Sequence, residues 1–314
     1  MAAALALAER GRGRTAPNPN VGCLIVKDGV VVGRGWTRPG GRPHAEAVAL
    51  GQAGDAARGA TAYVTLEPCA HGSARGPDCS GALAAAGIAR AVIALGDPDP
   101  RTNGKGISRL RAAGVDVTVG VLESDARRSM AGFLTRRALG RPFVTLKFGL
   151  SLDGCIALDN GESRWITGPA ARAHSHLERC RHEAILVGRG TLRIDLPKLD
   201  VRLAGLEDRS PRRILLSINP ESGWTSIPAP INIASLAGVD HLLIEGGART
   251  ASAFLRADLV DRLLLYRAPV LLGGKAALDD LGLTSLGEVH GRWRMHDSRM
   301  LGSDRLEVYE RARS

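Results

Sequence analysis

The sequence contains few aromatic residues and few lysines. Phe, Trp and Tyr make up 4% of its 314 residues, and only five of its 42 basic residues are lysines. Proteins that bind single-stranded nucleic acid combine a basic groove with aromatic side chains on which bases stack. Here the net charge of +10 is carried by arginines scattered along the chain, which disfavours a polynucleotide-binding surface. The same charge suits small phosphorylated ligands.

Long hydrophobic runs and a disulfide framework are also missing. No apolar stretch approaches the roughly 20 residues that cross a bilayer, so we expect no membrane partner. The five cysteines form an odd set without disulfide-scaffold spacing, which favours a reducing compartment. Residues 1–7 are apolar but lack a basic region before them, so they are expected to form a first helix and not a signal peptide. These features predict a cytoplasmic protein.

The most informative pattern combines His, Glu and Cys in the first third of the chain. His44-Ala45-Glu46 is followed by Thr65-Leu66-Glu67-Pro68-Cys69 and then by Cys79. One His and two Cys supply three ligands suited to Zn²⁺ and leave a fourth position for water. An H-x-E motif followed by P-C and a further Cys is typical of zinc-dependent nucleobase deaminases. Their usual second half is P-C-x-x-C, whereas nine residues separate Cys69 from Cys79 here.

Zinc chemistry accounts for these residue types. A zinc-bound water has a pKa of roughly 7, so hydroxide is available at neutral pH. It would attack a ring carbon that carries an exocyclic amine, while Glu46 passes protons to the ring nitrogen and to the departing ammonia. The alternative is a set of core thiols beside an unrelated surface His, which would require the whole pattern to be a coincidence.

Strands and helices alternate along both halves of the chain, which predicts α/β domains with mostly buried sheets. In the first half we expect strands at 21–27, 30–35, 61–66, 91–95 and 115–119, and helices at 2–9, 45–52, 80–86, 107–113 and 123–138. In the second half we expect strands at 143–148, 184–187, 213–217, 241–244, 262–268, 293–298 and 304–310, and helices at 169–180 and 249–255. Arg141-Pro142 marks the expected boundary, giving domains 1–141 and 142–314.

Three motifs of the second half suggest a site for a nucleotide. Lys147, Ser151, Asp153 and Gly154 form K-x-x-x-S-x-D-G at the end of a strand. Gly-containing turns follow two further strands, at 187–191 and 242–247, and Gly-Gly before a helix lets backbone N–H groups approach a phosphate. Each motif alone is weak, because such glycines often form simple turns. There is no G-x-G-x-x-G, so a Rossmann domain is not supported.

In chain order, the segments HAE, TLEPC, LKFGLSLDG, GESRWIT, DLPKLDVR and IEGG resemble the bifunctional riboflavin-biosynthesis enzymes, which fuse a pyrimidine deaminase to a pyrimidine reductase. The resemblance covers nearly the whole chain. It implies a cytidine-deaminase-like α/β/α sandwich followed by a dihydrofolate-reductase-like α/β domain. The implied reactions are deamination of 2,5-diamino-6-ribosylamino-4(3H)-pyrimidinone 5′-phosphate and NADPH-dependent reduction of its ribosyl side chain to ribityl. The implied cofactors are Zn²⁺ and NADPH.

The resemblance also implies roles for individual residues. His44, Cys69 and Cys79 match the zinc ligands, and Glu46 matches the proton-transferring residue. The implied deaminase substrate contacts are Asn18, His71, Arg75 and Asp97, with Arg75 near the substrate phosphate. The implied reductase substrate contacts are Ser163, Arg179, Leu199, Arg202 and Glu245. The implied NADPH contacts are Leu150, Trp165, Thr191, Asp195, Gly247, Ala248, Arg249, Thr250, Ala251, Ser252 and Ala253.

The chain departs from the family pattern in two places. The Cys69–Cys79 loop is one residue longer than usual, which affects the assignments of His71 and Arg75. The segment 219–240 is shorter than the family's strand and helix there, and a Ser expected near Ile218 to contact NADP has no counterpart. Two alternatives therefore stay open: a zinc deaminase with a non-catalytic C-terminal interaction or oligomerisation domain, and a polynucleotide-editing deaminase. A homo-oligomer is compatible with the sequence.

Overall fold

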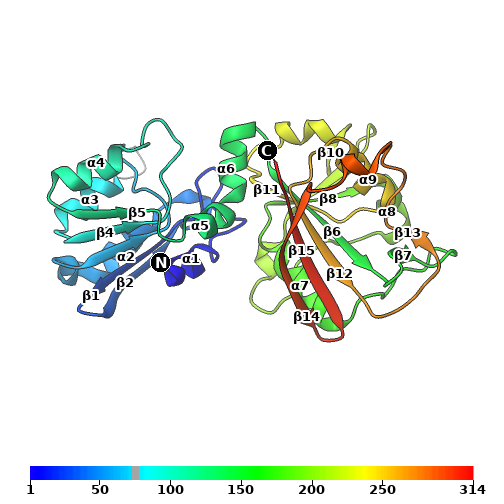
Figure 1. The fold of residues 1–314 in the computed structure, drawn as a ribbon, viewed down its shortest axis with the longest axis horizontal. Coiled ribbons are helices and arrows are strands. Elements are labelled where there is room, and N and C mark those ends of the chain that lie inside the picture. The colour runs from blue at the N-terminus through cyan, green and yellow to red at the C-terminus, as the bar shows by residue number, and fades with distance from the viewer. Residues whose placement is uncertain (73–77, 314) are drawn as a thin grey trace. The chain divides into compact units, whose positions relative to one another are not determined.

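The computed structural model describes residues 1–72 and 78–313 and divides the chain into two compact units (Figure 1). They comprise Met1–Gly140 and Arg141–Ser314, so the division lies one residue before the expected boundary. None of the helices in the described ranges is long and apolar enough to cross a bilayer. Each unit has its own sheet and its own core.

The first unit contains a five-stranded mixed sheet in the order β2-β1-β3-β4-β5. Strand β1 pairs antiparallel with β2 and with the central strand β3, whereas β3, β4 and β5 are parallel. The strands are β1 (Gly22–Lys27), β2 (Val30–Trp36), β3 (Thr61–Val64), β4 (Arg90–Ile93) and β5 (Asp116–Val119). The helices are α1 (Ala2–Ala8), α2 (Ala45–Ala53), α3 (Cys79–Ala85), α4 (Lys105–Ala112), α5 (Glu123–Ser129) and α6 (Ala131–Leu139), with short 3-10 helices at Pro39–Gly41 and Gly54–Ala57.

Helix α2 packs unusually closely against β2. A Cβ atom added at Gly35 would overlap the carbonyl oxygen of Ala45, and one at Gly33 would overlap that of Ala49. The helix is Ala-rich on this side, and Ala45 and Ala49 are fully buried. Because only Gly opposite Ala allows this approach, the sequence of β2 fixes where α2 begins. Residues 44–46 lie at that end of the helix.

The second unit is built on an eight-stranded sheet in the order β10-β9-β8-β11-β6-β12-β15-β14, and β7 pairs with β13 in a separate ribbon. The first six strands of this order, β10-β9-β8-β11-β6-β12, pair in parallel. Strand β15 pairs antiparallel with β12, and β14 pairs antiparallel with β15. The strands are β6 (Phe143–Leu150), β7 (Cys155–Ala157), β8 (Ala184–Gly188), β9 (Arg212–Leu216), β10 (Thr225–Ile227), β11 (His241–Ile244), β12 (Arg262–Arg267), β13 (Lys275–Ala276), β14 (Trp293–Leu301) and β15 (Asp304–Arg311). The helices are α7 (Pro169–Arg179), α8 (Arg189–Asp195) and α9 (Ala248–Arg256), with 3-10 helices at Glu207–Arg209, Pro230–Ser235 and Leu286–Glu288.

Burial explains the apolar runs of the central strands. Every residue of β8 and β11 is buried, as expected for parallel strands covered on both faces. The edge strand β14 is largely exposed and carries polar residues at most positions. The sheet therefore places the carboxyl ends of β8, β11 and β6 side by side, where the three nucleotide-like motifs lie.

Two local predictions need revision. The helix expected over 123–138 is two helices, because the chain turns at the fully buried Met130. The Gly-containing segment after β8, one of the three suggested nucleotide motifs, leads into helix α8. The segment 219–240 holds a short strand, β10, that extends the sheet parallel to β9, followed by a 3-10 helix.

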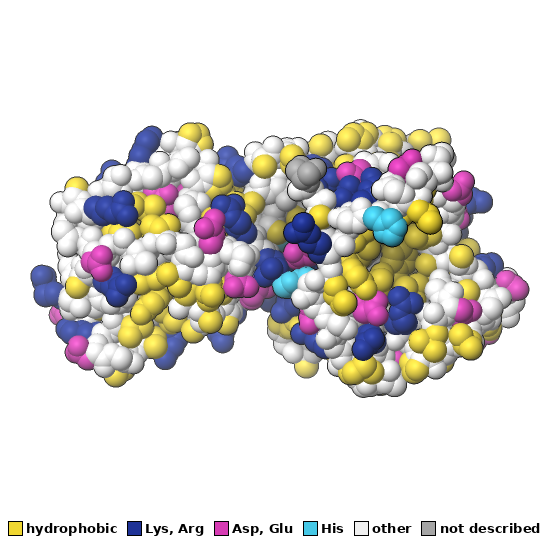
Figure 2. All heavy atoms as spheres, in the orientation of Figure 1, with side chains coloured by type: hydrophobic (Ala, Val, Ile, Leu, Met, Phe, Trp, Pro, Cys, Tyr) yellow, Lys and Arg dark blue, Asp and Glu magenta, His cyan; other side chains and the backbone are white. Residues whose placement is uncertain are grey.

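Charged side chains are distributed over the visible surface in separate groups. Figure 2 shows basic side chains interspersed with acidic and uncharged ones and no continuous basic stripe on this face. This distribution agrees with the scattered positions of arginine in the sequence.

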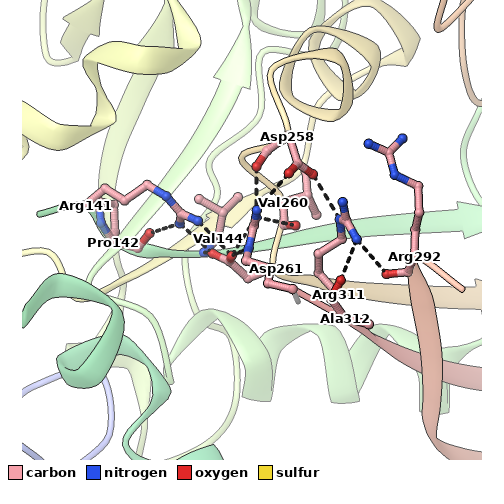
Figure 3. A network of polar contacts seen from close by, with 10 residues as sticks. Arg141, Pro142, Val144, Asp258, Val260, Asp261, Arg292, Arg311 and Ala312 are labelled. Atoms are coloured by element: carbon pink, nitrogen blue, oxygen red, sulfur yellow. Dashed lines mark hydrogen bonds and ion pairs between the residues drawn. The ribbon is translucent and has the colours of Figure 1, made fainter. Parts of the chain in front are cut away.

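A buried ion-pair network joins the start of the second unit to its C-terminal segment (Figure 3). Asp261 accepts two hydrogen bonds from Arg141, at 2.7 and 2.9 Å, and further bonds from Arg313 and from the backbone N–H of Val144. Asp258 pairs with Arg311 and Arg313. The Arg141 and Asp261 side chains are 9% and 8% exposed, so loss of the Asp261 charge would leave the Arg141 guanidinium buried without this counter-ion.

Candidate functional site

His44, Cys69 and Cys79 come together in the first unit. One ligand atom from each lies within 4.8 Å of the others, and His44 Nδ1 is 3.3 Å from Cys79 Sγ and 3.7 Å from Cys69 Sγ. His44 is the N-cap residue of α2, Cys79 is the first residue of α3, and Cys69 follows the turn after β3. A set of one imidazole and two thiols fits zinc and leaves the fourth position open.

The surroundings of the Cys69 sulfur favour a metal-binding thiolate. The Cys79 thiol donates a hydrogen bond to Cys69 and thereby lowers the pKa of Cys69, although burial acts in the opposite direction. The backbone N–H of Cys79 also points at Cys69 Sγ, at 3.3 Å. Asp78 caps α3 by accepting the N–H of Gly81 at 2.6 Å, which holds the first turn of α3 and Cys79 in place.

Glu46 lies beside this cluster and is almost completely buried, with 3% of its surface exposed. Burial raises its pKa to about 7, and the neighbouring His44 only partly opposes that effect. A carboxyl group with a pKa near neutrality can both accept and release a proton at physiological pH. The structure thus places a proton-transfer group next to the three metal ligands.

Three of the four predicted deaminase substrate residues line the same pocket. Asn18, His71 and Asp97 share it with His44, Glu46 and Cys69. Asn18 Nδ2 lies 3.2 Å from His44 Nε2 and donates to the carbonyl of Gly41 at 2.8 Å. The fourth predicted residue, Arg75, lies outside the described residues.

Glu67 organises one wall of this pocket, although the sequence reasoning gave it no role. Its buried carboxylate accepts four backbone N–H groups: those of Asp97 and Gly104 on Oε2, at 3.2 and 3.0 Å, and those of Gly106 and Ile107 on Oε1, at 2.9 and 3.1 Å. The segment 97–107 therefore wraps around one side chain. The only sequence signal was the position of Glu67 inside the TLEPC motif.

In the second unit, a buried carboxylate lies among cations at the end of β11. Glu245 forms a bidentate pair with Arg179, at 2.8 and 2.9 Å, and lies 3.8 Å from Lys147 Nζ. Burial alone would raise the pKa of Glu245, but Lys147 and Arg179 outweigh it and lower the pKa to about 2. Lys147 was noted in the sequence as part of a motif but was not assigned to the site.

The other predicted reductase substrate residues differ in their accessibility. Arg179 also donates a hydrogen bond to the backbone carbonyl of Asp200. Arg202, two residues after Asp200, has a side chain that is 57% exposed. Ser163 is half-buried. Leu199 is only 5% exposed and belongs to a core cluster with the strands, so its side chain faces the core.

Most of the predicted NADPH residues lie on the first turns of α9 and on α8, whereas Leu150 ends β6 and Trp165 precedes α7. The N–H of Gly247 donates to Thr191 Oγ1 at 3.2 Å, and no side chain caps α9 among the residues that the structure describes. The first backbone N–H groups of a helix lack intrahelical partners, so this end of α9 can accept a phosphate. Trp165 is 64% exposed. The guanidinium of the preceding residue, Arg164, donates a hydrogen bond to the backbone carbonyl of Asp195 at 2.6 Å.

Burial separates the predicted NADPH residues into two groups. Gly247, Ala248 and Arg249 are at least partly exposed. The side chains of Leu150, Thr250, Ala251 and Ser252 are at most 6% exposed, and Ser252 is bonded to the backbone of Asp279. Ala253 is half-buried. A cofactor at this helix would therefore meet the backbone of its first turn and not the side chains of 250–252.

Comparisons with known proteins agree with this division into two sites. Residues 1–95 match the family model described as the cytidine and deoxycytidylate deaminase zinc-binding region. Residues 142–222 and 226–306 match the RibD C-terminal domain. The first match contains the three metal ligands, and the second contains Glu245 and the start of α9.

Relatives are similar over almost the whole chain. The riboflavin biosynthesis protein RibD of Escherichia coli is 41% identical, over 88% of this chain and 88% of its own length. That of Mycobacterium tuberculosis is 39% identical, over 94% and 91%. RibD of Acinetobacter baumannii has a solved structure that superposes with a TM-score of 0.88 at 35% identity, over 99% and 98% of the two chains.

A further solved structure, from Thermotoga maritima, is described as a diaminohydroxyphosphoribosylaminopyrimidine deaminase/5-amino-6-(5-phosphoribosylamino)uracil reductase. It has a TM-score of 0.86 at 30% identity over 99% of this chain. These similarities confirm the predicted combination of a deaminase fold with a reductase fold. The chain belongs to the RibD family, the bifunctional deaminase–reductases of riboflavin biosynthesis.

Proposed function

We propose that the first unit removes the amino group of 2,5-diamino-6-ribosylamino-4(3H)-pyrimidinone 5′-phosphate, with His44, Cys69 and Cys79 as zinc ligands and Glu46 as the catalytic residue. The clustering of the three ligand atoms, beside a pocket that His44, Glu46 and Cys69 line, supports the proposal. Zinc at such a site supplies a water that is acidic enough to act as a nucleophile at neutral pH.

The protein's own residues move the protons. Glu46 would take a proton from the attacking water and deliver it to a ring nitrogen. It would then take the second proton, from the hydroxyl group added to the ring carbon, and deliver it to the departing amine. Water is consumed and ammonia is released, so the ring gains a carbonyl oxygen. The pKa of about 7 suits both directions of transfer. Asn18, His71 and Asp97 would orient the pyrimidine, since they line the pocket around the ligands.

In the second unit, we propose that Arg179, Arg202 and Glu245 bind the deaminated substrate and that the start of α9 binds the phosphates of NADPH. NADPH supplies the reducing equivalents that convert the ribosyl side chain to ribityl. The ion pairs of Glu245 keep it charged across the physiological range, so it can accept hydrogen bonds from sugar hydroxyls. Thr191 and Asp195 lie on α8, and Arg164, the neighbour of Trp165, donates to the carbonyl of Asp195; we propose that these residues contact the cofactor. Ser163 lies in the same segment as Trp165, and Leu199 would contact ligand only through its backbone.

We further propose that the chain acts in the cytoplasm on free nucleotides, without a nucleic-acid or membrane partner. The dispersed basic groups of Figure 2 and the low aromatic content support this proposal. Incubation with single-stranded RNA and with the free pyrimidine nucleotide distinguishes the two substrate classes. A homo-oligomer remains an expectation, which light scattering of the purified protein would test.

The deaminase proposal is tested with Glu46→Gln. This variant should retain zinc in elemental analysis. Its rate of ammonia release should fall at least about 100-fold, because general acid–base catalysis contributes on that order to the rate. Its NADPH oxidation with supplied deaminated intermediate should be unchanged. A variant with full ammonia release would refute the role of Glu46.

A further inference from the structure

We infer that Arg101 and Arg137, which both donate hydrogen bonds to Asp99, form the binding site for the 5′-phosphate of the deaminase substrate. This inference rests on the proposed function of the first unit. Neither arginine belongs to a motif, and the two lie 36 positions apart, on the loop after β4 and on α6.

A buried carboxylate holds the two guanidinium groups together. Arg101 donates from Nε to Asp99 Oδ1 at 3.0 Å and from Nη2 to Oδ2 at 2.6 Å. Arg137 donates from Nη2 to the same Oδ2 at 3.1 Å. Asp99 is 6% exposed, whereas the arginine side chains are 62% and 46% exposed. The carboxylate is thus an internal anchor, and both guanidinium groups reach the surface of the pocket.

The position of this triad fits the shape of the substrate. Asp99, Arg101 and Arg137 line the same pocket as His44 and Glu46. The carbon that loses its amine must lie at the buried metal ligands, so the phosphate, at the opposite end of the molecule, must lie toward the exposed part of the pocket. The two exposed guanidinium groups occupy such a part.

The N–H donors of the triad also suit an anion. Two guanidinium groups and one carboxylate give the triad a net charge of +1, which the nearby Asp97 carboxylate partly offsets. A guanidinium has five N–H donors, and the contacts with Asp99 leave Nη1 of Arg101 and both Nε and Nη1 of Arg137 for a ligand. Planar guanidinium groups bind phosphate oxygens in pairs. Asp99 fixes their orientation in advance, which distinguishes this pair from Arg42, a third arginine of the pocket.

The test compares the phosphorylated substrate with its dephosphorylated nucleoside. We would measure kcat and KM for ammonia release with both compounds, in the wild type, in Arg101→Gln, in Arg137→Gln and in the double variant. Arg34→Gln, on an exposed position of β2 outside the pocket lining, is the matched control. Zinc content and NADPH oxidation with supplied intermediate verify that each variant is folded.

The double variant should raise KM for the phosphorylated substrate on the order of tenfold to hundredfold, the effect of losing hydrogen bonds to a charged group. Its KM for the nucleoside and its kcat should match the wild type. Inorganic phosphate should inhibit the wild type competitively and the double variant more weakly. If the Gln variants do not fold, Arg101→Lys/Arg137→Lys keeps both charges but loses the paired geometry, and KM for the phosphorylated substrate should still rise.

Two results would overturn the inference. A KM ratio between the two substrates that equals the wild-type ratio would place phosphate recognition elsewhere in the pocket or in segment 73–77. An equal rise of KM for both substrates would make the triad a structural element. If the wild type itself releases no ammonia from either compound, the proposed function fails, which is a separate outcome.

Discussion

Replacement of Glu67 by Gln tests how the deaminase pocket is built. The carboxylate accepts two backbone N–H groups on each oxygen, and Gln offers one oxygen and one NH₂ group. Two of the four N–H groups would face a donor. An unsatisfied buried donor costs about 1–3 kcal/mol, so we predict that the unfolding free energy of the first unit falls by about 2–6 kcal/mol. A typical domain has 5–15 kcal/mol of stability, so the variant should remain folded.

The same substitution should impair deamination more than zinc binding. The released segment carries Asp97 and also Thr102, whose hydroxyl lies 3.3 Å from His71 Nδ1. A misplacement of about 1 Å can cost on the order of 100-fold in rate, and we expect kcat/KM for ammonia release to fall by about 10- to 100-fold. The metal ligands lie on other elements, so zinc content should be unchanged, and NADPH oxidation should be unaffected.

Denaturant unfolding and steady-state kinetics provide the measurement. Glu123→Gln is the control, because Glu123 is 46% exposed and, within the described ranges, its ion pair is with Arg127 on the same helix, a contact worth about 0.3–0.5 kcal/mol. If Glu67→Gln shifted the stability no more than this control and left deamination intact, the reasoning about the four hydrogen bonds would be refuted.

Three further predictions concern the second unit. Burial raises the pKa of Glu183 to about 7, so its contribution to stability is present below the unfolded pKa of about 4.5 and is lost as the pH rises through 7. Glu183→Gln should therefore flatten the decline in stability between about pH 4.5 and pH 7, worth up to about 3 kcal/mol, as thermal unfolding at several pH values would show. Asp261→Asn should cost about 3–5 kcal/mol in urea unfolding, because Arg141 stays buried without its partner; a cost below 1 kcal/mol would contradict the network of Figure 3. Glu245→Gln should lower NADPH oxidation at least about tenfold, since Arg179 loses a charged partner, while ammonia release stays at the wild-type rate.

The sequence predicted what short motifs encode. His44, Glu46, Cys69 and Cys79 belong to two recognisable patterns. The structure brings the three ligands together beside the pocket that His44, Glu46 and Cys69 line. The alternation of strands and helices likewise predicted most elements of both sheets, because central parallel strands read as apolar runs. The strands β7, β10 and β13 escaped prediction. They contain two or three residues each, which is too short for a periodic pattern.

Contacts between distant segments could not be predicted in this way. Glu67 meets backbone N–H groups about 30 to 40 positions away, and backbone groups leave no trace in the residue pattern. The Asp99–Arg137 pair spans 38 positions and depends on how α6 packs. Conversely, the resemblance placed NADPH contacts at Ala251 and Ser252, whose side chains the fold buries, since a matched position does not reveal which atoms face the cleft.

One coupled assay tests most directly whether a single chain carries both activities at separate sites. The diaminopyrimidinone phosphate and NADPH are supplied together, and ammonia release and NADPH oxidation are followed independently in the wild type and in Glu46→Gln. We predict equal amounts of both events in the wild type. In the variant we predict no ammonia, with NADPH oxidation only when the deaminated intermediate is added. Absence of NADPH oxidation by the wild type, even with that intermediate, would contradict the account.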